Sequence, residues 1–362
     1  MAYRPEDARG GYLNTPYCYQ TTTLVAGTSA RLLADTDRGV ETLSAVLKHA
    51  GNGTITAPGA ERICEWLNAR PPDRAPLPRE VELELTTEDQ LRDTQLRPRG
   101  DVVPRRGPID VAVVRRLVDE LRTFDDALLV LGGFGEPLLC PQFAEILEIC
   151  RPTQGSDGDG VFGLTVRTNG LALDRPALER LAAHRVDVVL VTLDAHSAET
   201  YRAVHGTDAF ACVNANLEGL MQWRQQTRCV RPMLVPELIK ARETFDDMES
   251  FFDHWIGRVG SAVIRGYSHC AGQLPDRAVM NMAPVQRCAC RRLTSRCLVL
   301  ADGRVVACDQ DFAGKQVLGD LTRVSLHAVW TGQQAKQIHA CHVTGELAGL
   351  PLCPRCDEWH RP

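Results

Sequence analysis

The chain has 362 residues, a formal net charge of −5 and a sequence pI near 6.1. This length predicts one main domain with smaller modules, and the acidic balance leaves no basic face of the kind that binds nucleic acid. No apolar run reaches the roughly 18 residues that a membrane span needs, and the N-terminus lacks the apolar centre of a signal peptide. We therefore expect a cytoplasmic protein without nucleic-acid or membrane partners, whose cysteines stay reduced.

The first segment of the chain is set apart by a proline-rich linker. Helical spacing occurs at residues 39–50 and 60–67, and four prolines follow within residues 70–78. Proline cannot sit inside a helix, so this stretch marks a boundary. A second boundary is expected near 273–287, where the apolar periodicity fades. The sequence thus predicts an N-terminal accessory domain (1–78), a main domain (79–285) and a C-terminal domain (286–362).

Within the main domain, apolar strand-like runs alternate with amphipathic helical segments. The expected strands are 81–85, 127–131, 162–167, 186–193, 232–235 and 262–264, and the expected helices are 109–124, 143–150, 176–184 and 244–255. This alternation predicts parallel βα units and an α/β fold, here a partial (β/α)6 TIM-like barrel. Functional loops in such a barrel lie at the C-terminal ends of the strands.

Three polar motifs stand at these strand ends. The first strand leads into ELTTEDQLRDTQLR (84–97), the second ends in GGFGEP (132–137), and the third ends in Thr168-Asn169-Gly170. Their order and spacing resemble the radical SAM superfamily, which has E-x-T before CxxxCxxC, then a GGEP turn at the methionyl amino group and a TNG near the nucleotide. The resemblance implies that S-adenosylmethionine would be contacted by Gly133, Gly135, Glu136, Thr168 and Asn169.

The chain departs from this family at the cluster loop itself. The three positions that should be cysteine are Asp89, Asp93 and Leu96. A [4Fe–4S] cluster needs soft thiolate ligands, whereas carboxylate is a hard ligand and leucine has no lone pair to give. We therefore expect no radical-generating cluster, no 5′-deoxyadenosyl radical and weakened binding of S-adenosylmethionine.

Two alternatives are open for the acidic residues of this loop. Asp89 and Asp93 are four residues apart and could hold Mg²⁺ or Mn²⁺ together. The simpler interpretation, which we favour, is that they are solvated carboxylates near Arg92, Arg97 and Arg99.

The C-terminal cysteines form a second pattern. Cys290 is followed by twelve residues, Gly303, four residues and Cys308, and the pattern ends at Cys353-Pro-Arg-Cys356. Residues 298–307 between them are typical of a β-hairpin around an Asp-Gly turn. The pattern resembles the SPASM and twitch iron–sulfur domains, and since the chain ends six residues after Cys356, the shorter twitch form fits better. It implies one auxiliary [4Fe–4S] cluster held by these four cysteines.

A structural zinc site remains the alternative, because a Cys₄ zinc ribbon uses similar spacing. Cys288 competes with Cys290, although the interval to Gly303 favours Cys290. Cys297 is expected to be a small buried hydrophobe. Six isolated cysteines are expected to be structural: Cys18, Cys64, Cys140, Cys150, Cys212 and Cys229.

Three functions are consistent with these patterns. The first is a radical-SAM-like partner or scaffold in a biosynthetic pathway of peptide or aminocyclitol and sugar modification, binding an active radical SAM enzyme or a peptide or small-molecule substrate. The second is an enzyme that uses S-adenosylmethionine for non-radical chemistry such as methyl transfer, and the third is unrelated chemistry at the barrel mouth. We favour the first. The sequence assigns no catalytic residue, and residues 1–78 suit either a precursor-peptide-binding domain or a cap on the barrel.

Overall fold

The computed structural model describes residues 37–50, 57–69, 77–91, 96–124, 126–155 and 160–361. The chain divides into two compact units, Met1–Ala75 and Pro76–Pro362. The first contains helices α1 (Asp37–Ala50) and α2 (Ala57–Ala69), which contact each other, with the rings of His49 and Trp66 stacked 4.6 Å apart. Both helices predicted there are thus confirmed. The boundary expected at 285/286 stays a prediction.

The second unit is built on one sheet of nine strands in the order β6-β5-β4-β3-β2-β1-β7-β8-β9. The first six strands are parallel and follow the predicted positions: β1 Glu80–Glu84, β2 Leu128–Gly132, β3 Gly163–Thr168, β4 Val188–Thr192, β5 Met233–Lys240 and β6 Val263–Gly266. The α/β class and the partial barrel are therefore as predicted.

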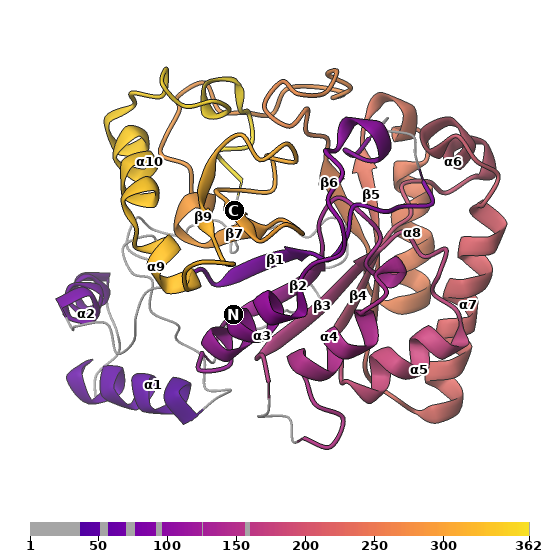
Figure 1. The fold of residues 1–362 in the computed structure, drawn as a ribbon, viewed down its shortest axis with the longest axis horizontal. Coiled ribbons are helices and arrows are strands. Elements are labelled where there is room, and N and C mark those ends of the chain that lie inside the picture. Colours follow the sequence, from indigo (N-terminus) through magenta and orange to yellow (C-terminus); the bar gives the residue numbers. More distant parts are fainter. Residues whose placement is uncertain are drawn as a thin grey trace. The chain divides into compact units, whose positions relative to one another are not determined.

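Helices connect the parallel strands, and in Figure 1 α3, α4 and α5 lie along one side of the strands β1 to β4. The connecting helices are α3 Val111–Leu121, α4 Phe143–Cys150, α5 Arg175–Ala183, α6 Ala198–His205, α7 Phe210–Thr227 and α8 Met248–Val259. Local signals fix where they begin: Asp110 and Asp174 accept a hydrogen bond from the backbone N–H of Ala112 and Ala177. The sequence analysis did not predict α6 and α7.

The two faces of β1 differ in kind, and this difference positions the site. Val81 and Leu83 are fully buried in the main apolar core, which includes residues of α3 and α4. Glu82 and Glu84 alternate with them and point to the opposite face, because successive side chains of a strand do so. Both are buried, so the barrel interior contains charged side chains that require partners.

The C-terminal part extends the sheet beyond β1. Strand β7 (Arg296–Val299) pairs parallel with β1, and β8 (Arg304–Val306) and β9 (Val317–Asp320) follow antiparallel. The predicted hairpin is present, with Gly303 at its turn in the left-handed region at φ +87°. Helices α9 (Leu326–Trp330) and α10 (Gln333–Thr344) pack on β9. Within the described residues, no helix has the length and apolarity to span a bilayer.

Candidate functional site

The Gly133–Pro137 turn after β2 is anchored through Glu136. The Glu136 carboxylate is 1 % exposed and accepts hydrogen bonds from Thr168 Oγ1 at 2.8 Å, from the Asn169 backbone N–H at 2.7 Å and from the Leu138 N–H at 3.1 Å. Burial raises its pKa to about 7, although these three donors act against that shift. Glu136 therefore joins the turn after β2 to the motif after β3.

The loop after β1 enters the same network through Asp89. The Asn169 side-chain amide donates to Asp89 Oδ1 at 2.9 Å, and Arg99 Nε lies 3.4 Å from Asp89 Oδ2. The Asp89 side chain is only 4 % exposed, and the Arg99 side chain is 8 % exposed. The expectation of a solvated carboxylate is therefore wrong for Asp89. Its charge is held by the buried Arg99, one of the three arginines expected near it.

Leu96, at the third cysteine position of the motif, faces an apolar environment. It is 4 % exposed and belongs to a small cluster with Val204, Ile239, Ala241 and Tyr267. Asp93, at the second position, lies outside the described residues. The described part of the chain holds no group of three or more His, Cys, Asp or Glu side chains arranged for one metal ion. The alternative of Mg²⁺ or Mn²⁺ held by Asp89 together with Asp93 stays untested.

Arg97 lies in the same region as Asp89 and Leu96 and pairs with two acidic side chains. Its guanidinium donates to both carboxylate oxygens of Asp194, at 2.8 and 2.9 Å, and to Glu237 Oε1 at 2.7 Å. Burial alone would raise the pKa of Asp194 and Glu237, but the Arg97 guanidinium outweighs it and holds both below their ordinary values. Arg97 is thus fixed by two ionised carboxylates.

The five residues predicted to contact S-adenosylmethionine do come together around one cavity at the barrel mouth. The lining includes Gly133, Gly135, Glu136, Thr168 and Asn169, along with Asp89, Leu96, Arg97 and Arg99. The remaining space is about 90 Å³, below the roughly 300 Å³ at which small-molecule sites begin. Their role in binding the cofactor stays a prediction.

A second cavity gathers the predicted metal ligands. Cys290, Cys308, Cys353 and Cys356 all line it, beside apolar Leu293, Leu352 and Trp359. These cysteines come from three separate segments: before β7, after β8, and the turn Cys353–Arg355. The set expected from the sequence spacing is therefore brought to one place by the fold.

The environment of these thiols is apolar but contains cations. Burial raises the pKa of Cys356 to about 12, and the charges of Cys290 and Cys353 act in the same direction. Arg287 donates to the Cys353 carbonyl at 2.8 Å, and the Glu358 N–H donates to Cys356 Sγ at 3.3 Å. The charge of Arg287 and the Glu358 N–H act to lower the pKa of Cys353 and Cys356 respectively, although burial outweighs both.

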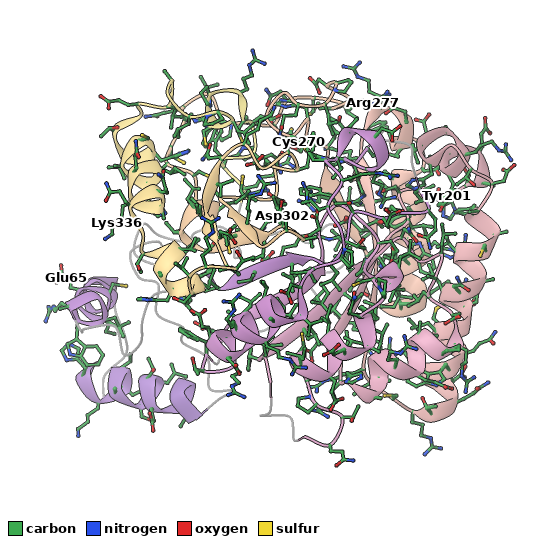
Figure 2. The ribbon with its side chains drawn as sticks, viewed as in Figure 1. Glu65, Tyr201, Cys270, Arg277, Asp302 and Lys336 are labelled. Atoms are coloured by element: carbon green, nitrogen blue, oxygen red, sulfur yellow. The ribbon has the colours of Figure 1, made fainter. Side chains whose placement is uncertain are left out.

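Among the described cysteines of the unit Pro76–Pro362, the other ones do not line this cavity. Cys288 is exposed and does not line it, whereas Cys297 is 3 % exposed within the main core, as predicted. Cys140 and Cys150 are buried, and Cys64, Cys212 and Cys229 are intermediate or exposed; Cys18 lies outside the described residues. Cys270, labelled in Figure 2, is buried and lines the cavity at the barrel mouth.

Buried charged residues are the main feature that the sequence analysis did not assign. Arg106 pairs with Glu84 at 2.5 Å, and Arg292 pairs with Asp309 at 2.5 Å. An acidic residue inside an apolar strand run, as at Glu82, Glu84 and Glu237, was the available signal, because a buried carboxylate needs a partner.

Comparison with protein families agrees with this geometry. Residues 93–246 match the family model described as Radical SAM superfamily, and residues 288–357 match the SPASM model, described as an iron–sulfur cluster-binding domain. The chain contains a radical SAM domain and an SPASM domain. The second match contains all four cysteines of the C-terminal cavity, and the first begins within the loop of residues 84–97.

Curated relatives of this radical SAM protein are distant. A protein of Treponema pallidum (strain Nichols), described as uncharacterized, is 26 % identical over 258 residues, covering 69 % of this chain and 68 % of the relative. A GTP 3′,8-cyclase of Chlorobaculum tepidum is 25 % identical over 194 residues, covering 50 % of this chain and 56 % of the relative. The chain thus spans little more than half the length of that cyclase.

A solved structure supports the fold. The Streptococcus suis protein SuiB, in a crystal structure bound to S-adenosylmethionine, matches with a TM-score of 0.59 at 12 % identity, covering 84 % of this chain and 78 % of SuiB. SuiB is also known in a complex with the precursor peptide SuiA. At this identity the likeness concerns the fold alone.

Proposed function

We propose that this radical SAM protein generates no 5′-deoxyadenosyl radical, carries one auxiliary [4Fe–4S] cluster and serves as a binding partner in a biosynthetic pathway. The observation that carries the proposal is the occupation of the cluster loop's surroundings by the protein's own side chains. Asp89 is held by Asn169 and Arg99, and Leu96 is packed among apolar residues.

The loop after β1 lacks the ligands that a radical-generating cluster needs. A [4Fe–4S] cluster at the barrel mouth requires three thiolates, and no cysteine lies in the loop of residues 84–97. The nearby carboxylates are not free to replace the thiolates as ligands. Asp194 and Glu237 pair with Arg97, and Asp89 pairs with Arg99. Cys270, which also lines this mouth, supplies one thiol at most.

The C-terminal cavity, in contrast, suits an iron–sulfur cluster. It offers four cysteines and an apolar wall, the donor set that such a cluster takes. The alternative is a zinc ion, which would draw the same four sulfurs to about 2.3 Å from one point. When bound, the cluster would supply a one-electron centre and cross-link the three cysteine-bearing segments.

The partner is proposed from the family context. SuiB, which shares the fold, is described in complex with a precursor peptide, and we propose that this chain likewise binds a peptide or small-molecule substrate, or an active radical SAM enzyme that modifies it. A separate N-terminal unit, Met1–Ala75, is available for such binding.

One observation favours a second function. The Gly133–Glu136 turn and the Thr168–Asn169 motif keep their mutual hydrogen bonds, so non-radical use of S-adenosylmethionine, such as methyl transfer, is the alternative. The cavity of about 90 Å³ argues against tight binding of a cofactor of that size.

Anaerobic purification followed by metal and cofactor assays tests the proposal. We expect about four irons per chain, the content of one [4Fe–4S] cluster, and no 5′-deoxyadenosine when the dithionite-reduced protein is given S-adenosylmethionine. Cys290→Ala should lose the iron, whereas the matched Cys288→Ala should keep it. Stoichiometric zinc would overturn the cluster assignment, and 5′-deoxyadenosine formation would overturn the loss of radical chemistry. Tight calorimetric binding with methyl transfer would favour the alternative.

A further inference from the structure

A cavity with a charged lining lies at the open side of the barrel, along the edge strand β6. Its volume is about 480 Å³, within the range of small-molecule sites. Among the described strands, β6 pairs only with β5, so its other edge faces this space. The cavity shares Glu82, Arg167 and Arg265 with the smaller cavity at the mouth.

The lining carries an excess of positive charge. Six basic and four acidic side chains contribute to it. Each acidic side chain is already paired with an arginine: Glu80 with Arg296, Glu82 with Arg167, Asp309 with Arg265 and Arg292, and Glu358 with Arg292 and Arg361. The four acidic groups are thus neutralised by arginines, and the lining keeps a net positive charge that can attract an anion.

That surplus is centred on Lys240, at the C-terminal end of β5. Its amine makes no hydrogen bond or ion pair with any side chain in the described part of the chain, although the residue is half-buried. A half-buried amine without a partner has lost part of its hydration and gains from an anion placed beside it. Lys240 is therefore a donor that the fold leaves free.

A second cation lies on the same face. Lys240 and Gly266 are register partners on neighbouring parallel strands, so their side-chain directions coincide. A Cβ built on Gly266 would meet the guanidinium of Arg361. The Arg361 guanidinium therefore covers Gly266 on the side to which Lys240 points. Arg361 is held there by Glu358, to which it donates at 2.9 and 3.1 Å.

The remaining wall of the cavity is apolar. It includes Val263 and Ile264 of β6 and Met280 and Met282 of the segment that follows. Met280 and Met282 are 59 % and 56 % exposed, so they border the entrance. A ligand with an acidic group at one end and an apolar body would match both parts of this lining.

We propose that this cavity binds a small organic anion whose carboxylate or phosphate pairs with Lys240 and Arg361 while its apolar part lies along β6 and Met280. Arginine and lysine recognise both acid groups, arginine through its planar fork. The proposal goes beyond the proposed function, because it concerns another cavity and holds whether or not the chain makes radicals or binds iron.

Calorimetry on the full chain with matched probes tests the charge requirement. The probes are 4-phenylbutyrate, its neutral amide 4-phenylbutyramide, and phenyl phosphate. We expect the carboxylate or the phosphate to bind at least about tenfold more tightly than the amide, the effect of one charge-assisted hydrogen bond. Preference between the two anions distinguishes a carboxylate ligand from a phosphate ester.

Two variants locate the site. Lys240→Gln should weaken binding of the preferred anion about tenfold, and the matched Lys336→Gln should not change it. Lys336 is exposed on α10, at the opposite side of Figure 2 from Tyr201. Thermal melting of both variants checks that they remain folded.

Chemical labelling provides a readout that does not depend on a variant. The chain has only four lysines, at 48, 240, 315 and 336, so amine acetylation followed by mass spectrometry reports on each of them. The preferred anion should slow acetylation of Lys240 and leave the other three unchanged. Equal binding of acid and amide, unaltered affinity in Lys240→Gln, or no protection of Lys240 by either anion would overturn the proposal.

Discussion

At the scale of single residues, Asp89 is fixed by two buried partners, Asn169 and Arg99. The backbone still places residue 89 beside Asn169, but the carboxylate there accepts a hydrogen bond and pairs with Arg99. Arg99 in turn donates to Thr192 at 3.0 Å, which connects the loop to the end of β4. The carboxylate and the guanidinium neutralise each other in a place with little access to water.

Asp89→Ala should therefore destabilise the protein. Removing one partner of a buried pair leaves the other charge uncompensated, which costs about 3 kcal/mol or more of unfolding free energy. Urea denaturation measures the loss. Its neighbour Glu88 is exposed, so Glu88→Ala should change stability by no more than about 0.5 kcal/mol. Equal effects of the two changes would contradict the structural role given to Asp89.

Glu136 should make stability depend on pH. Its folded pKa of about 7 lies above the ordinary value of 4.5, mainly because of burial. The folded state therefore holds a proton that the unfolded state releases, and stability falls as pH rises from about 4.5 to about 7, then levels off. The shift corresponds to about 3 kcal/mol.

The matched variant for this effect is Glu136→Gln. Its amide replaces one acceptor by a donor, so it loses stability at every pH, but it carries no ionisation cost. The difference in unfolding free energy between wild type and variant should therefore shrink between pH 5 and pH 8, as followed by urea denaturation. A difference independent of pH would show that Glu136 is already ionised at pH 5.

At the scale of elements, β1 is the strand that joins the radical SAM and SPASM parts. It pairs in parallel with β2 on one side and with β7 on the other. Glu84 strengthens this junction, because its Oε1 accepts both from Arg106 and from the Ala301 backbone N–H at 3.0 Å. The SPASM strands are therefore held by sheet hydrogen bonds that do not involve the cysteine cavity.

Loss of the C-terminal metal centre should therefore loosen only part of the SPASM region. In Cys353→Ala/Cys356→Ala, amide hydrogen exchange should accelerate around Cys353–Arg355, which has few backbone hydrogen bonds of its own. Strand β7 should stay protected, because it pairs with β1. Cys288→Ala is the control and should match wild type. Loss of protection throughout β7 and β8 would mean that the centre supports the whole region.

At the scale of the whole molecule, the sequence predicted the six parallel strands because buried strands appear as short apolar runs. Strand β5 is longer than predicted, since Glu237 interrupts the run and is tolerated only through Arg97. Helix α7 carries apolar residues at helical spacing, Val213, Leu217 and Leu220, a signal that the sequence analysis did not use.

Contacts between distant parts of the chain were not predictable in the same way. The pairing of β7 with β1 joins residues more than 200 positions apart, and periodicity within each strand says nothing about its neighbour. The cysteine cavity was predictable because metal ligands follow known spacings. The sequence placed three arginines near Asp89, and only the structure shows that Arg99 pairs with it.

The last prediction concerns the iron content of the whole chain when cysteine stands at all three positions of the loop after β1. Asp89→Cys/Asp93→Cys/Leu96→Cys recreates the thiolate spacing on the loop that still lies beside Asn169 and the Gly133–Glu136 turn. After anaerobic reconstitution, iron should rise by about four per chain, the content of one added [4Fe–4S] cluster. Arg99, freed from Asp89, remains beside the loop as a cation that favours thiolate.

The matched control is the double variant Asp89→Cys/Asp93→Cys, which keeps Leu96 in its apolar cluster and supplies only two of the three thiolates, so its iron should stay at the wild-type level. Iron assays and electron paramagnetic resonance compare the variants. Extra iron without cleavage of S-adenosylmethionine would mean that the small cavity at the mouth no longer admits the cofactor. Unchanged iron in the triple variant would contradict the assignment of Asp89, Asp93 and Leu96 to the three cysteine positions. All three thiolates would then be present, so their failure to bind a cluster would mean that they are in the wrong places.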